Sequence, residues 1–202
     1  MNHIETIPLE LVYKGTRDYL HGTDMYDAII AQLRSAIPQH THGAVKMVMH
    51  GFARHQCDLM YTLGQTRCPK PVDARVEFFF GDVVSGWLAE TARPVSSRRP
   101  YKEDELVASS RIDGHSITAG AVVPCSVIEM LVALTKRLHT VLRPDQTKWA
   151  FTRLELQRPL VDDDAGRLQV ELLQSLGNRL TKSAVRTEST ALGHIYFSAV
   201  TS

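Results

Sequence analysis

The sequence has few cysteines, no excess of charge of either sign and no long apolar run. Its three cysteines, Cys57, Cys68 and Cys125, form no Cys-x-x-Cys pair, and an odd number leaves one over from any disulfide framework. This cysteine usage favours a reducing compartment, so we expect a cytoplasmic protein.

The charges nearly cancel, with 23 Lys and Arg against 22 Asp and Glu and a formal net charge of +1. Nucleic-acid binders usually carry a basic excess, and no acidic tail indicates a basic partner. The longest uncharged apolar stretch, 116–128, is too short to span a bilayer. The first fifteen residues lack the pattern of a signal peptide. We therefore expect no nucleic-acid partner and no membrane association.

The 202 residues are 44% hydrophobic and 22% charged, which is ordinary for a globular protein. A chain of this length buries a core without disulfides. We expect one domain over 1–202, made of an N-terminal strand and helix extension (1–43), first strands and a connection (44–113), an active loop and central helix (114–144) and C-terminal strands (145–202).

Hydrophobic spacing predicts a first helix over 24–37, where Ile29 and Leu33 recur at helical spacing. Thr23 is the expected cap of this helix, and Pro38 follows its end.

A second helix is predicted within 121–144, and its first half is apolar on nearly all sides, so it must be buried. Its second half, with Lys136 and Arg137, can emerge into water. Alternation and β-forming residues predict strands over 44–64, 75–97, 148–160, 167–190 and 194–202. The pattern predicts an α+β fold in which a curved antiparallel sheet wraps around one long central helix.

A Gly-His pair precedes this central helix, and Glu129 lies on the helix fourteen positions after His115. Downstream, 154–190 contains a strand, an Arg-Pro step, an acidic turn and a long strand pair. Over residues 110–200 these features resemble the hot-dog fold, and specifically the β-hydroxyacyl-thioester dehydratases of fatty acid and polyketide synthesis.

The resemblance implies a catalytic pair. His115 would remove the acidic α-proton, for which an imidazole is suited near neutral pH. Glu129 would expel the β-hydroxyl as the acid, and we expect its apolar neighbours to raise its pKa by desolvation.

The chain departs from the family at the start of the central helix, where the family has Pro-Gly and this sequence has Val123-Pro124. The family's Gly amide helps to bind the thioester oxygen, but a proline has no N–H to donate. Amides at the helix start can substitute because helix N-termini bind negative charge. The expected substrate-binding residues are Gly114, Gly120, Cys125 and Ser126.

Simpler interpretations of these residues remain open. His115 would then be a loop histidine near Asp113, Glu129 a helix-start carboxylate that favours the dipole or pairs with Lys136, and Cys125 a buried structural thiol. The run Asp162–Asp164 is interpreted as a solvated turn.

Two further groups carry weaker signals. No ligand spacing unites the histidines and cysteines of 40–68, so we expect no metal and no cofactor. Four basic residues flank the active loop and are either plain surface or contacts for the phosphates of coenzyme A or phosphopantetheine; they are Arg98, Arg99, Lys102 and Arg111.

The resemblance implies a lyase, a β-hydroxyacyl dehydratase or dehydratase-isomerase acting on acyl groups carried by acyl carrier protein (ACP) or coenzyme A. The alternatives are a hot-dog thioesterase, which uses a carboxylate to activate water and does not need His115, and a non-catalytic acyl-thioester-binding protein. We also expect a homodimer, because hot-dog proteins pair their sheets edge to edge.

Overall fold

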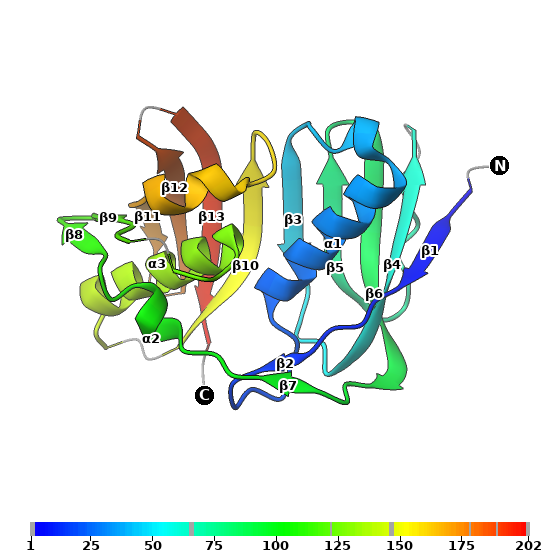
Figure 1. The fold of residues 1–202 in the computed structure, drawn as a ribbon, viewed down its shortest axis with the longest axis horizontal. Coiled ribbons are helices and arrows are strands. Elements are labelled where there is room, and N and C mark those ends of the chain that lie inside the picture. The colour runs from blue at the N-terminus through cyan, green and yellow to red at the C-terminus, as the bar shows by residue number, and fades with distance from the viewer. Residues whose placement is uncertain are drawn as a thin grey trace. The chain divides into compact units, whose positions relative to one another are not determined.

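The computed structural model describes residues 3–64, 67–121, 123–145, 148–177, 179–188 and 190–200. The chain divides into two compact units, unit 1 (Met1–Tyr101) and unit 2 (Lys102–Ser202), each with its own long helix and strands (Figure 1). The boundary falls inside 44–113, which the sequence analysis assigned to the first strands and a connection. The helix assigned to an N-terminal extension is the long helix of unit 1.

The main strands of unit 1 follow the order β1-β4-β6-β5-β3, and neighbours are antiparallel. In β5 the burial alternates residue by residue, because successive side chains of a strand point to opposite faces. The strand bounds are β1 (Glu5–Pro8), β3 (Val45–Met49), β4 (His55–Leu63), β5 (Ala74–Phe80) and β6 (Val84–Pro94). A parallel pair joins β2 (Tyr13–Lys14) to β7 (Arg98–Arg99).

The long helix of unit 1 is α1 (Gly22–Ala36), and the short 3-10 helix η1 (Pro38–His40) follows it. Its apolar face, which includes Ile29 and Leu33, is buried. The predicted cap was wrong by two positions, since the N-cap is His21 rather than Thr23 and no side chain caps the helix there.

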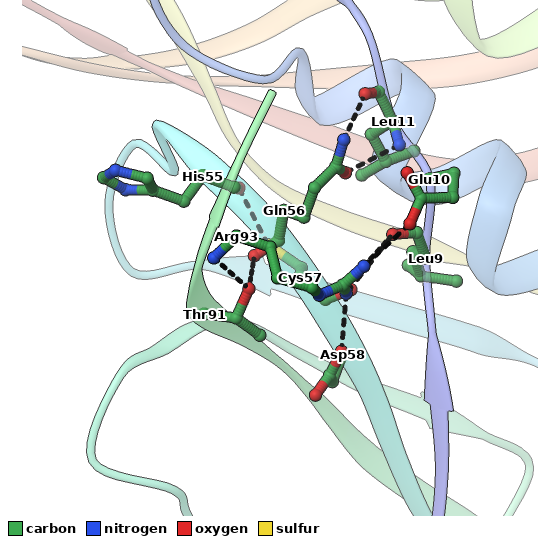
Figure 2. Close-up of polar contacts among 9 residues, drawn as sticks. All are labelled: Leu9, Glu10, Leu11, His55, Gln56, Cys57, Asp58, Thr91 and Arg93. Carbon is green, nitrogen blue, oxygen red and sulfur yellow. Dashed lines mark hydrogen bonds and ion pairs between the residues drawn. The ribbon is translucent and has the colours of Figure 1, made fainter. Parts of the chain in front are cut away.

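The segment that follows β1 is held to the sheet by two side chains (Figure 2). The Leu11 amide donates to Gln56 Oε1 at 2.7 Å, and Gln56 Nε2 donates back to the Leu11 carbonyl at 2.8 Å. The Arg93 guanidinium donates to Glu10 at 2.7 Å and to Asp58 at 2.8 Å. Leu11 lies beyond the end of β1, so its backbone groups have no strand partner, and the Gln56 side chain, which is only 3% exposed, satisfies both of them.

The strands of unit 2 follow the order β10-β13-β12-β11-β9-β8, again antiparallel. Their bounds are β8 (Arg111–Asp113), β9 (Ser116–Thr118), β10 (Trp149–Leu156), β11 (Leu168–Leu176), β12 (Leu180–Thr187) and β13 (Thr190–Ala199). Two short helices complete the unit, α2 (Glu103–Leu106) and η2 (Asp162–Arg167).

The long helix of unit 2 is α3 (Val127–Leu142), and it contacts β9, β10 and β11. As predicted, its first half is buried on nearly all sides and its second half reaches water, with Arg137 exposed. The helix ends before Arg143-Pro144. No helix in the described part of the chain is long and apolar enough to cross a membrane.

The acidic turn before β11 is not fully solvated, which corrects the interpretation of Asp162–Asp164. The Asp164 side chain is 2% exposed and binds both terminal nitrogens of Arg158 at 2.8 Å. Burial opposes ionisation of this carboxyl, but hydrogen bonds from Arg158 and from the Val161 amide outweigh it and lower the pKa of Asp164.

Candidate functional site

The Gly-His pair forms the two-residue turn of a hairpin between β8 and β9, in which Asp113 pairs with Ser116. Gly114 has φ +54°, the left-handed conformation that such turns require and glycine adopts without strain. The Leu172 amide donates to the His115 carbonyl at 2.9 Å and fixes the turn on β11. The His115 ring is exposed and forms no hydrogen bond to a described residue.

Glu129 lies in the first turn of α3, where it forms a capping box with Ser126. The Ser126 amide donates to Glu129 Oε2 at 2.9 Å, and the Glu129 amide donates to Ser126 Oγ at 3.3 Å. Glu129 is 6% exposed. The sequence therefore places a buried carboxyl at the positive end of the helix dipole and fixes one of its oxygens.

The alternative pairing of Glu129 with Lys136 is wrong. Lys136 Nζ donates to Glu103 Oε1 of α2 at 2.8 Å, with both side chains half-buried. This ion pair attaches α2 to the middle of α3.

The two candidate oxyanion donors, the amides of Cys125 and Ser126, lie at the start of α3. The Ser126 amide already donates to Glu129, so it reaches a ligand only if that carboxyl turns away. Cys125 precedes the N-cap Ser126, so it lies outside α3, and it is half-buried rather than fully buried as the simpler interpretation expected.

Gly120 lies where the backbone passes close to the loop after α2. A Cβ atom at this position would stand 2.2 Å from the Ser109 carbonyl oxygen, so only glycine fits. The Ala121 amide donates to Ser109 Oγ at 2.9 Å. The substrate-binding roles of Gly114, Gly120, Cys125 and Ser126 and the catalytic roles of His115 and Glu129 stay predictions.

Sequence reasoning missed a polar cluster at the start of α1 in unit 1. Asp24 occupies the third position of α1, as Glu129 does in α3, and both carboxyls are buried. Lys14, which is 0% exposed, pairs with Asp24 Oδ1 at 2.7 Å and donates to Thr23 Oγ1 at 2.9 Å. The one sequence signal for this cluster was Asp24 itself, an acidic residue in the first turn of a predicted helix.

Three of the four basic residues considered for phosphate binding have protein partners; they are Arg98, Arg99 and Lys102. Arg99 donates to Asp24 Oδ1 at 2.7 Å, and Lys102 donates to Glu105 at 2.7 Å. Arg98 Nη1 donates to the carbonyls of Gly15 at 2.6 Å and Arg17 at 2.7 Å.

The histidines and cysteines of 40–68 are dispersed. Among the residues that the structure describes, no three His, Cys, Asp or Glu side chains gather as a metal site. His55 binds Glu90 at 3.1 Å, and burial raises the pKa of the Cys57 thiol to about 12, which makes it unreactive.

Comparison with known proteins shows the fold. No family model matches the sequence, and no curated protein matches it. Among solved structures, the chain is similar to the dehydratase domain of PpsC from Mycobacterium tuberculosis in complex with C12:1-CoA, with 11% identity, a TM-score of 0.51, and 98% of this chain and 94% of that chain covered. A further structure of the PpsC dehydratase domain gives 10% identity and a TM-score of 0.50, covering 100% of this chain and 94% of that one.

A third similar structure is the pyran synthase domain from module nine of the sorangicin pathway, with 10% identity, a TM-score of 0.51, and 100% and 94% coverage. With antiparallel strands around a long buried helix already described, this likeness confirms the predicted fold class. The chain has the hot-dog α+β fold, the fold of polyketide synthase dehydratase domains.

Proposed function

We propose that the chain is an acyl-thioester-processing lyase, a β-hydroxyacyl-ACP/CoA dehydratase or dehydratase-isomerase of fatty acid or polyketide-type biosynthesis. The observation that carries the proposal is the buried Glu129 carboxyl, fixed by Ser126 at the start of α3. The dehydratase fold supports it, and one structure of that fold holds C12:1-CoA. The acyl group would accordingly arrive on coenzyme A or on an acyl carrier protein.

The reaction assigns one proton transfer to each residue. The His115 imidazole takes the α-proton, and the electron pair of that C–H bond forms the α,β double bond. The bond between the β-carbon and its oxygen breaks, and protonated Glu129 gives its proton to the departing hydroxyl, which leaves as water. Proton transfer from His115 back to Glu129 through solvent restores the starting state.

The thioester oxygen gains negative charge as the α-proton leaves. The start of α3 offers the positive end of the helix dipole and the Cys125 amide to this oxygen. This donor compensates for Pro124, which stands where the family has an N–H.

A thioesterase is the second candidate, and the exposed His115 ring favours it. A carboxylate that activates water needs no histidine, and Glu129 alone meets that requirement. The third candidate is a non-catalytic acyl-thioester-binding protein, which would bind the acyl thioester without turning it over.

We further propose a cytoplasmic homodimer. In the described part of unit 1, β1 pairs with β4 on one side, so its other edge is available to a second copy. A closed two-fold pairing would cover such an edge.

Incubation with two substrate types separates the candidates. A 3-hydroxyacyl thioester that loses water, as followed by mass, supports the dehydratase, whereas free thiol released from a saturated acyl thioester supports the thioesterase. Loss of neither water nor thiol, with binding retained, supports the non-catalytic reading and refutes the proposal.

A further inference from the structure

The short segment 103–110, made of α2 and the turn that follows it, is attached to α3 at its start. Lys136 Nζ donates to Glu103 Oε1 at 2.8 Å, and the side chains of Lys136 and Glu103 are only 23% and 22% exposed. Lys136 lies in the middle of α3, and α2 packs against this helix (Figure 1). A half-buried ion pair thus fixes the first residue of the segment on α3.

At its other end, the same segment contacts the loop that precedes α3. The Ala121 amide donates to Ser109 Oγ at 2.9 Å. A Cβ atom at Gly120 would stand 2.2 Å from the Ser109 carbonyl oxygen, so the two backbones touch directly. The loop is therefore held by a hydrogen bond and by close packing at adjacent residues.

The turn between the two ends is closed by hydrogen bonds. The Val107 carbonyl accepts from the Ser110 amide at 3.0 Å and from Ser110 Oγ at 2.6 Å. Val107 is 5% exposed, so the turn is also anchored by burial. A displacement at Glu103 is therefore transmitted to Ser109 rather than absorbed between them.

The loop leads to the groups that the proposed chemistry uses. At its start the Ala119 amide donates to the Leu168 carbonyl of β11 at 2.8 Å, and at its end lie Cys125 and the N-cap Ser126. A loop joined to a helix by the chain alone can swing about the helix end. The contact with segment 103–110 closes a second path from the loop to α3 and restricts this motion.

We propose that segment 103–110 positions the loop 119–126 on α3, with Glu103 and Ser109 as the positioning residues. In one respect the inference rests on the proposed function, because the group that the loop positions is the Cys125 amide, which would meet the thioester oxygen. Glu103 and Ser109 act through the loop and touch no reacting atom. Since an exposed hydrogen bond and a half-buried ion pair are each weak, their loss should open the loop locally and leave the fold intact.

Hydrogen exchange of the full chain without substrate, followed by mass on peptides that cover 119–126, tests the attachment. Glu103→Gln should speed exchange in these peptides roughly threefold, although Glu103 lies at the opposite end of the segment. Ser109→Ala should speed it about fivefold, because the Ala121 amide loses its acceptor. Ser109→Thr keeps the oxygen and should restore the wild-type rate.

The matched control is Glu105→Gln, which is the same substitution on the same helix. Glu105 pairs with Lys102 at 2.7 Å through side chains that are 66% and 70% exposed. Its loss should leave the exchange of 119–126 at the wild-type rate. Equal exchange in Glu103→Gln and Glu105→Gln overturns the inference. If Glu103→Gln fails to fold, the exposed Ser109 decides through its Ala and Thr variants.

Turnover of a 3-hydroxyacyl thioester gives the second measurement. Glu103→Gln and Ser109→Ala should lower kcat by the same factors with KM unchanged, because the contact to the thioester oxygen strengthens in the transition state. Faster exchange with an unchanged kcat overturns the inference and keeps the proposed function. Faster exchange in the variants of a chain whose wild type turns over no thioester removes the proposed function and keeps the attachment.

Discussion

Ser126 and Glu129 bind each other reciprocally at the start of α3, each through its backbone amide to the other's side chain, at 2.9 and 3.3 Å. This capping box both begins the helix and fixes the carboxyl on which the proposed chemistry depends. Helix stability and carboxyl position are therefore linked at one residue.

Ser126→Ala should lower the free energy of unfolding by about 1 kcal/mol, because the Glu129 amide loses its acceptor. Ser126→Thr keeps an oxygen in the same place and should restore most of the loss. Urea unfolding of both variants and the wild type measures the effect. Equal midpoints for Ala and wild type would show that the cap contributes nothing.

His139 should make the protein less stable in acid. It is fully buried in the last turn of α3 between Trp149 and Phe197, and burial and nearby Arg143 lower its pKa from 6.5 to about 4. The unfolded chain binds this proton near pH 6.5, so stability falls as the pH drops from 6.5 to 4 and levels off below. The full contribution is about 3 kcal/mol.

Urea unfolding between pH 7 and pH 4 checks this dependence, with His139→Phe as the comparison. The variant should lack this part of the pH dependence. The same slope in both proteins would mean that another group titrates.

Gln56→Leu should destabilise unit 1 by about 2 kcal/mol, because it leaves the Leu11 amide and carbonyl without their partner. Gln56→Glu keeps the acceptor for the Leu11 amide and loses only the donor to the Leu11 carbonyl, so its loss of stability should differ from that of Gln56→Leu. Thermal unfolding of the full chain measures both. Wild-type stability in Gln56→Leu would show that water replaces the side chain at no cost.

Light scattering at micromolar concentration should give the mass of two chains, as the proposed homodimer requires. Mixing His115→Ala and Glu129→Gln proteins after dissociation then tests whether the site is shared between subunits. Shared sites should recover about a quarter of wild-type activity by two-fold symmetry. Proven exchange without recovery would place the pair within one subunit.

The buried central helix and the strands were predictable because both depend on local patterns. An apolar run such as 127–135 must be covered, and alternation as in β5 marks a half-buried strand. Glu129 was singled out by its distance of fourteen positions from His115 and by the family resemblance, and the structure shows it buried in the first turn of α3, while its catalytic role stays a prediction. Local hydrophobic patterns were therefore sufficient to predict the central helix and the main strands.

The cluster around Asp24 was not predictable, because its partners come from distant segments. Arg99 lies 75 positions from Asp24 and reaches it only through the pairing of β2 with β7. A single lysine in a strand, such as Lys14, has the pattern of a solvated residue. Long-range pairing, which no local pattern encodes, buries it.

The most direct test of the central claim is the rate of 2-enoyl thioester formation from a 3-hydroxyacyl thioester by wild type and by Glu129→Gln. The amide is nearly isosteric, so circular dichroism should show an intact fold. We expect dehydration by the wild type and a loss of at least about a hundredfold in the variant, because a positioned acid contributes that much. Full activity in a well-folded Glu129→Gln protein would contradict the account.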